Sequence, residues 1–418
     1  MKIWILKEGE PLPCDENPRL MRVGILAEYL ARRGHQVVWW STTFIHGAKT
    51  YRCQEQRELD IRENETLILL HSRVAYKKNT SLNRIRYNRI LAQEFARNCE
   101  KYERPDLILC SYPTVEFAEK AISYGRKNHV PVILDVRDYW PDIFTRVFPA
   151  KLDWLVKIGI LPMALQAKHA FRRANAITGV VPSALRWGLE KAGREQNLFD
   201  RTIYIGYKPD IWQDEEERRA VLMRWQNCGI TPDTWNICFF GTMSSSSLDI
   251  DTCIEAVTEL SNQYPDIRLV LCGDGDALKR YKKIANGNKC IVFPGWVGKT
   301  QIQSILEISK AGIYPYRNLW DFKNSYSNKI IGYMAEGLPV LSSLEGFSEQ
   351  YIEKYDIGIN YKEGDVSSCR EAIETLYCDE KDRQNKGHNS YQRFKTDFDA
   401  EVVNRQFESL MEEILRSH

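Results

Sequence analysis

The stretch LVLCGDGDALKRYKKI, residues 269–284, decides the fold. Its first four residues are apolar, as in a strand that is covered on both faces of a parallel sheet. The turn Gly273-Asp274-Gly275 follows, and the helical stretch Ala277–Ile284 completes the unit. The segment therefore predicts one strand, one loop and one helix of an α/β domain.

The same alternation of short apolar runs and amphipathic stretches continues through the chain. Helical spacing is clear in Arg19–Arg33, Thr114–Lys127 and Phe398–Arg416. Since such units build parallel sheets, the sequence predicts two successive Rossmann-like domains, over residues 1–185 and 186–397. The expected strands are Ile3–Leu6, Val37–Trp40, Thr66–Leu70, Leu107–Cys110, Val132–Asp135, Ala176–Val180, Ile203–Ile205, Ile237–Phe240, Leu269–Cys272, Ile291–Phe293, Gly312–Tyr314 and Val340–Leu341.

Composition excludes several classes of protein. The 418 residues are 43% hydrophobic and 27% charged with a net charge of +2, a balance that excludes a nucleic-acid binder driven by phosphate neutralisation. Eleven cysteines without a CxxC pair indicate the reduced thiols of a cytoplasmic protein rather than disulfides or zinc. Apolar runs stay shorter than the roughly 18 residues that a membrane-spanning helix needs. The apolar stretch near the N-terminus is too short for a signal peptide.

Loops after the expected strands carry the candidate chemistry, because open parallel sheets bind ligands there. Gly273–Gly275 would let backbone N–H groups approach a phosphate, or would simply form a turn. Gly241 and Thr242, followed by Ser244–Ser247, could cradle an anion in the same way or form a flexible turn. Gly298-Lys299-Thr300 lacks the glycine that a P-loop needs five residues earlier, so ATP hydrolysis is rejected.

The most unusual loop is DVRDYWPD, residues 135–142. Its carboxylates and guanidinium follow a strand, where a carboxylate could act as a base and Arg137 could hold an anion. The alternative is pairing of aspartate and arginine within the loop. His46 and Arg52 are further candidate acceptor contacts, whereas the seven histidines show no metal-binding spacing.

Lys329 lies in the first turn of an expected helix, after Ser325-Tyr326-Ser327-Asn328. A cation at that point opposes the helix dipole unless an anion meets it. The position therefore favours a phosphate ligand over chance placement on a surface turn.

Together these segments resemble the family-four retaining glycosyltransferases of the GT-B fold, in the branch that builds bacterial O-antigen and capsule polysaccharides. The points of resemblance are LAEYLARRGHQVV (26–38), DVRDYWPD (135–142), CGDG (272–275), FPGWV (293–297) and SNKIIGYMAEGLPV (327–340).

The resemblance implies two Rossmann-like domains facing across a cleft. It places the acceptor on residues 1–185 with the C-terminal helix 398–418 crossing back to them, and the donor on 186–397. Asp138 and Arg137 would lie near the reaction centre. The implied donor-binding residues are Gly241, Thr242, Gly273, Asp274 and Gly275 at the diphosphate, Trp296 and Val297 at the base, and Asn328 and Lys329 at the phosphate charge.

Two departures from the family pattern concern its pair of glutamates, which fall here on Asn324 and Gly332. Loss of the second, a ribose carboxylate, should weaken donor binding by about 1–3 kcal/mol. Either Lys329 compensates or the donor binds poorly.

The leading hypothesis is a retaining, metal-independent and cofactor-free transferase of hexosyl or N-acetylaminodeoxyhexosyl groups, from a nucleoside-diphosphate sugar to a glycan or lipid-linked acceptor. A sugar-nucleotide epimerase of the same fold and a non-catalytic subunit of a glycan-assembly complex remain alternatives.

Residues 1–200 are rich in Lys and Arg, which would attract an anionic membrane or a phosphate-bearing substrate, or merely make a solvated surface. Trp154–Leu165 would dock on the inner face of that membrane, or form a core helix interrupted at Gly159 and Pro162.

Overall fold

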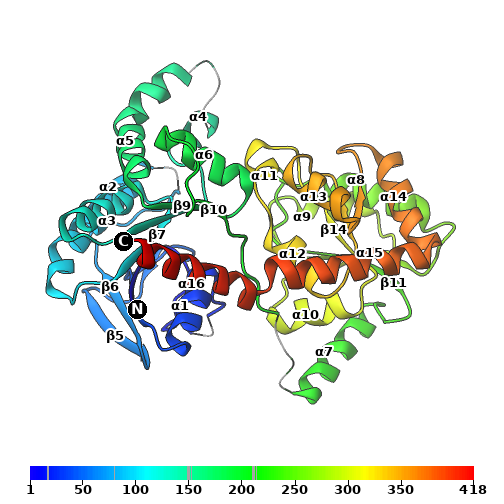
Figure 1. Ribbon diagram of the computed structural model, residues 1–418. Helices are drawn as coiled ribbons and strands as arrows, with labels where there is room; N and C mark the ends of the chain where they lie inside the picture. The colour runs from blue at the N-terminus through cyan, green and yellow to red at the C-terminus, as the bar shows by residue number, and fades with distance from the viewer. Residues whose placement is uncertain (17, 80, 148–150, 152, 210–211, 213) are drawn as a thin grey trace. The chain divides into compact units, whose positions relative to one another are not determined.

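The computed structural model describes residues 1–16, 18–79, 81–147, 151, 153–209, 212 and 214–418 (Figure 1). These residues form two compact units: the first contains 1–206 and 400–418, and the second contains 207–399. The predicted boundary at 185–186 thus moves to 206–207. The reason is that α6 (Pro182–Ala192) packs on the first sheet and β10 (Arg201–Thr202) pairs with β9 (Ala176–Gly179) at its edge.

The sheet of the first unit has eight strands in the order β10-β9-β8-β7-β1-β2-β6-β5. Its strands pair in parallel except β5, which runs antiparallel to β6. The strands not yet given are β1 (Lys2–Leu6), β2 (Gln36–Thr42), β5 (Arg57–Arg62), β6 (Glu65–Leu70), β7 (Leu107–Tyr112) and β8 (Val132–Val136), with a separate hairpin of β3 (Phe44–Ile45) and β4 (Thr50–Tyr51).

Helices cover this sheet by burying one apolar face each. In α1 (Arg22–Arg32), Val23, Leu26 and Leu30 face the core at helical spacing. The remaining helices of the first unit are α2 (Leu82–Asn98), α3 (Val115–Asn128), α4 (Phe144–Val147), α5 (Asp153–Arg173) and α16 (Ala400–Ser417), with a 3-10 turn at Cys99–Lys101.

The C-terminal helix α16 belongs to the first unit, where the family resemblance places it. Its residues Phe407, Leu410 and Met411 are buried in the core beside α1. Glu408 accepts hydrogen bonds from Tyr29 Oη at 2.9 Å and Arg33 Nε at 3.1 Å, so polar contacts fix the same helix.

The second unit has six parallel strands in the order β13-β12-β11-β14-β15-β16. They are β11 (Trp235–Phe240), β12 (Ile267–Cys272), β13 (Ile291–Gly295), β14 (Ala311–Tyr314), β15 (Val340–Ser342) and β16 (Gly358–Asn360). The helices are α7 (Glu215–Asn227), α8 (Ile250–Leu260), α9 (Leu278–Ala285), α10 (Lys299–Glu307), α11 (Trp320–Lys323), α12 (Asn328–Ala335), α13 (Phe347–Tyr355), α14 (Val366–Cys378) and α15 (Glu380–Arg393), with a π-helical turn at Phe394–Phe398.

Two local expectations are corrected. The run Ile203–Ile205 does not open the second sheet but follows β10 in the first unit, where Ile203 is buried. The helix α5 continues through Gly159 and Pro162 without interruption. Among the described helices none has both the length and the apolar content that crossing a bilayer demands.

Candidate functional site

Two loops and the end of a third strand meet at the carboxyl ends of neighbouring strands in the second unit. The N–H of Gly241, after β11, donates to the Cys272 carbonyl at 2.9 Å, and that of Gly273, after β12, donates to the carbonyl of Gly295, the last residue of β13, at 2.8 Å. The Met243 N–H donates to the Asp274 carbonyl at 2.9 Å. The loops after β11 and β12 and the end of β13 therefore form one continuous backbone surface at this edge.

Glycine is required where these loops touch. A Cβ on Gly273 would lie 1.9 Å from the Gly241 carbonyl oxygen, and a Cβ on Gly275 would lie 2.2 Å from the Met243 carbonyl oxygen. Gly241 and Gly273 also have φ angles of 144° and 141°, which side chains rarely adopt. The glycines therefore allow the two loops to approach each other closely, and the approach of a phosphate to them stays a prediction.

Lys329 brings a positive charge to this surface. It is the second residue of α12, whose N-cap Ser327 accepts from the Lys329 N–H at 3.2 Å. Its Nζ donates to Tyr316 Oη at 2.9 Å, and a Cβ on Gly241 would lie 3.0 Å from Nζ. The structure therefore brings Lys329 and Gly241 into contact, although 88 positions of sequence separate them.

The other predicted donor residues lie around the same edge. Trp296 follows β13 and is 76% exposed, whereas its neighbour Val297 is buried. Thr242 and Asn328 are exposed. Asp274 is exposed too, and its carboxylate accepts from the Gly275 N–H at 2.7 Å, so it shapes the loop.

The two departures from the glutamate pattern have distinct surroundings. Asn324 caps α11, and its Nδ2 donates to the Trp320 carbonyl at 2.9 Å. Gly332 is buried in α12, where a Cβ would lie 3.6 Å from Tyr207 Oη and 3.8 Å from Phe240. A longer side chain at position 332 would meet these two rings, so the site is built without a carboxylate there.

The loop 135–142 in the first unit is anchored through its aspartates. Asp135 is fully buried and accepts from Arg22 Nε and Nη2, each at 3.0 Å, and from Thr178 Oγ1 at 2.8 Å. Burial is the largest single influence and raises the pKa of this carboxyl, but Arg22, Arg137 and the Thr178 hydrogen bond together bring the pKa below its usual value. Asp142 accepts from Trp187 Nε1 at 2.9 Å. These two carboxylates therefore hold the fold.

Arg137 and Asp138 remain at the half-exposed tip of that loop. Arg137 pairs with Glu10, from the loop after β1, so its ion pair joins two loops and not two residues of the same loop, as the alternative interpretation had it. Asp138 Oδ1 accepts from the Tyr139 N–H at 2.8 Å. The two residues therefore lie directly after a strand, and their place at a reaction centre stays a prediction.

Sequence reasoning missed a cluster of charged groups beside Arg137. Glu8 is buried and accepts from Thr114 Oγ1 at 2.5 Å. Burial raises the pKa of this carboxyl most, but Lys7 and Arg84, helped by the Thr114 hydrogen bond and by His46, together lower the pKa. Burial and Arg137 lower the pKa of Lys7. The sequence offered one signal for this cluster, because the charged stretch Lys7-Glu8-Gly9-Glu10 directly follows the strand β1.

His46, a candidate acceptor contact, lies beside this cluster. Its Nδ1 is 2.5 Å from Tyr76 Oη, and burial followed by Arg84 and Lys49 lowers the pKa of the imidazole. A neutral imidazole at pH 7 can accept a proton. Arg52 instead holds Asp15, with Nη2 donating to Oδ2 at 2.6 Å, and is structural.

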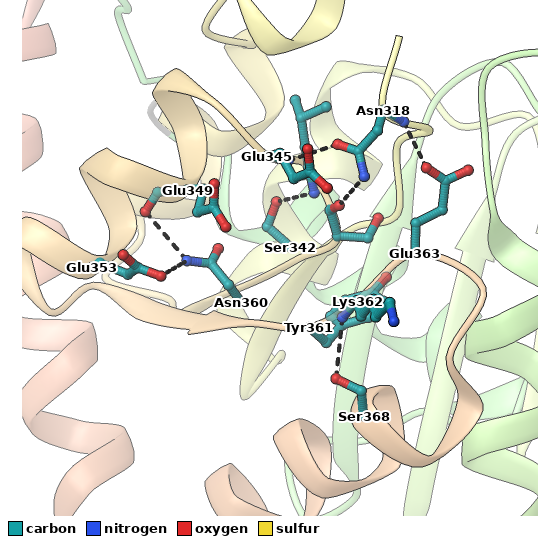
Figure 2. A pocket seen from close by; sticks show the side chains of 12 residues that line it. Asn318, Ser342, Glu345, Glu349, Glu353, Asn360, Tyr361, Lys362, Glu363 and Ser368 are labelled. Carbon is teal, nitrogen blue, oxygen red and sulfur yellow. Dashed lines mark hydrogen bonds between the residues drawn. The ribbon is translucent and has the colours of Figure 1, made fainter.

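A cavity of about 280 Å³ lies at the carboxyl ends of β15 and β16 (Figure 2). Glu345, Glu349, Glu353 and Glu363 line it, and Asn360 Nδ2 donates to the Glu353 carboxylate at 3.2 Å. Four carboxylates disfavour a diphosphate, and none of the predicted donor residues lines this cavity. Among the described residues, no group of three or more acidic, histidine or cysteine side chains could hold a metal ion.

Comparison with known proteins finds a family match for part of the second unit. Residues 234–379 match the family model of the glycosyl transferases group 1. This group 1 segment runs from β11 to α14 and contains every predicted donor residue from Gly241 to Lys329. No curated protein matches the chain in sequence.

Solved structures resemble the whole chain. Sucrose-phosphate synthase from Thermosynechococcus elongatus has a TM-score of 0.74 at 15% identity over 100% of both chains. HepE from Anabaena in complex with UDP-glucose has a TM-score of 0.66 at 15% identity over 100% of both chains. WaaG, a glycosyltransferase involved in lipopolysaccharide biosynthesis, has a TM-score of 0.59 at 13% identity over 98% of both chains. These likenesses show that the chain has the GT-B fold of two Rossmann-like domains.

Proposed function

We propose that the protein transfers a sugar from a nucleoside-diphosphate-sugar donor to a saccharide hydroxyl. The observation that carries this proposal is Lys329 Nζ beside Gly241, at the edge where the loops after β11 and β12 meet each other and the end of β13. The match of residues 234–379 to the glycosyl transferases group 1 supports it.

The donor phosphates would lie against this edge. The Lys329 ammonium offsets charge on the leaving diphosphate, so that a side chain performs what a divalent ion does in other transferases. The exposed Trp296 indole, after β13, would stack on the base of the donor. HepE, which has this fold, is in complex with UDP-glucose, and UDP-sugars are therefore the first donors to test.

The acceptor would occupy the first unit near Arg137 and Asp138. Arg137, fixed by Glu10, orients the acceptor, while Asp138 or the neutral imidazole of His46 accepts its hydroxyl proton. The resemblance of the sequence motifs supports retention of anomeric configuration and a lipid-linked acceptor in bacterial surface polysaccharide synthesis.

Calorimetric titration of the pure protein with UDP, GDP, dTDP, CMP and their sugars, without metal, tests the donor site. We expect one base to bind, and Lys329→Ala to weaken it about 10- to 100-fold, because a charged hydrogen bond contributes about 1.5–3 kcal/mol. Lys283→Ala, at an exposed lysine in the last turn of α9, is the matched control and should bind normally.

Equal affinity of the Lys329→Ala protein would refute the placement of the phosphates. Failure of every nucleotide to bind would refute the transferase itself and favour a non-catalytic subunit. Incubation of the bound donor with a lipid extract then shows whether sugar leaves the nucleotide for a lipid-linked product.

A further inference from the structure

The helix α5 exposes an unusually apolar surface. Five of its large apolar side chains are between 47% and 62% exposed, although side chains of this size are normally buried. They are Trp154, Leu155, Ile158, Leu161 and Leu165.

These side chains lie on one face of the helix. Positions 154, 158, 161 and 165 are spaced by four, three and four residues, which keeps them in one row. The opposite face is already used, because Met163, Ala167 and Phe171 are buried where α5 packs against α3 and α6. Packing within the first unit therefore does not explain why these apolar side chains lie on the outer face of α5.

The row changes from apolar to cationic along the helix. The next positions at the same spacing are Lys168 and Arg172, both exposed, and Arg173 lies beside them. The one acidic residue of α5, Asp153, is paired with Lys157 at 2.7 Å. We call Trp154, Ile158, Leu161, Leu165, Lys168 and Arg172 the α5 row.

We propose that the α5 row binds the surface of an anionic lipid bilayer. The apolar side chains would enter the boundary between headgroups and acyl chains, and Lys168 and Arg172 would meet lipid phosphates. This proposal identifies the membrane at which the proposed transferase would act. It rests on the proposed function, because a lipid-linked acceptor lies at such a surface.

Charge argues against a second copy of the chain as the occupant. If two copies packed their α5 rows in parallel, Lys168 and Arg172 of one copy would face Lys168 and Arg172 of the other, and like charges would repel. Antiparallel rows would place these cations on the apolar half, where they would lose water without gaining a partner. An anionic bilayer satisfies both halves of the row at once.

Co-sedimentation of the full chain with vesicles tests the proposal. We expect binding to vesicles of phosphatidylcholine with phosphatidylglycerol, and at least tenfold weaker binding to phosphatidylcholine alone. The variant Ile158→Ser/Leu161→Ser/Leu165→Ser should lose at least tenfold on anionic vesicles, and Lys168→Glu/Arg172→Glu should lose the preference for them.

The matched control is Leu82→Ser/Leu198→Ser, because these leucines of the same unit are 74% and 89% exposed but lie outside α5. It should bind like the unchanged chain. Circular dichroism and nucleotide titration of each variant show whether the fold and the donor site persist, so that a lost fold or a failed donor site is distinguished from a failed membrane site.

Three results would overturn the proposal. They are equal binding of the triple serine variant and the unchanged chain, equal binding to neutral and anionic vesicles, and concentration-dependent dimers in light scattering that the triple variant abolishes. The last result would assign the row to a second copy.

Discussion

Glu116 should make the stability of the first unit fall as pH rises. It lies in the first turn of α3, where the helix dipole favours a carboxylate, yet only 5% of the residue is exposed. Burial dominates and raises the pKa of this carboxyl from 4.5 to about 7, despite opposing effects of its own N–H and of Arg89. The folded protein therefore keeps Glu116 protonated where the unfolded chain has lost the proton.

The size of the effect follows from these two pKa values. Below pH 4.5 both states hold the proton, and the carboxyl makes no pH-dependent contribution. Between pH 4.5 and 7 the unfolded state holds fewer protons, so the free energy of unfolding decreases as pH rises. A difference of about 2.5 pKa units corresponds to about 3 kcal/mol, all of it lost by pH 8.

Glu116→Gln removes this titration while keeping the shape of the side chain. The variant should match the unchanged protein at pH 4 and exceed it by about 3 kcal/mol at pH 8. For a unit of roughly 200 residues, the difference in Tm should then grow by roughly 6–12 °C, measured by tryptophan fluorescence on heating. Glu119→Gln is the control, because that carboxylate is in the same helix but 29% exposed.

A constant difference in Tm between Glu116→Gln and the unchanged chain from pH 4 to pH 8 would refute the reasoning. It would mean that Glu116 is ionised in the folded state and that burial is offset at this position.

Two further predictions concern packing. Gly273→Ala should weaken nucleotide binding at least tenfold in calorimetry, because its Cβ would collide with the Gly241 carbonyl. The control Gly47→Ala, which has open space around its Cβ, should bind nucleotide normally. Equal affinities of the two variants would show that the loops adjust to the added methyl group. Arg22→Met should lower the free energy of unfolding by about 3–5 kcal/mol in urea titration, since it leaves Asp135 buried and unpaired. Adding Asp135→Asn should recover part of that loss, and no recovery would show that packing of Arg22 rather than its charge matters.

Much of the architecture could be predicted because buried parallel strands leave a strong trace. The runs at Ile3–Leu6, Leu107–Cys110 and Leu269–Cys272 are apolar throughout, and each lies within a strand. Two edge strands, β5 and β16, were missed for the opposite reason. β5 (RELDIR) has one face toward water, and β16 (GIN) is short, so neither shows a continuous apolar run.

The candidate site could be predicted only where its residues follow strands. Gly241 and Gly273 were found in this way, but their contact with each other depends on the register of β11 and β12. The pair Arg137–Glu10 joins positions 127 residues apart, and a single sequence holds no signal for it. The exposure of α5 was one of two interpretations of Trp154–Leu165, because an apolar helical stretch fits a docking surface as well as a core helix, and the structure shows five of its large apolar side chains exposed.

Because α16 belongs to the first unit, this unit is synthesised first but its core is completed last. The first unit lacks the side chains of Phe407, Leu410 and Met411 until the last residues emerge from the ribosome. At about 5–20 residues per second, the nascent chain waits roughly 10–40 s between finishing β10 and receiving α16. During that interval the core beside α1 is open to water and to chaperones, while the second unit already has all of its strands. A fusion partner that delays or obstructs the final helix would therefore harm the first unit, even though it is attached at the opposite end of the chain.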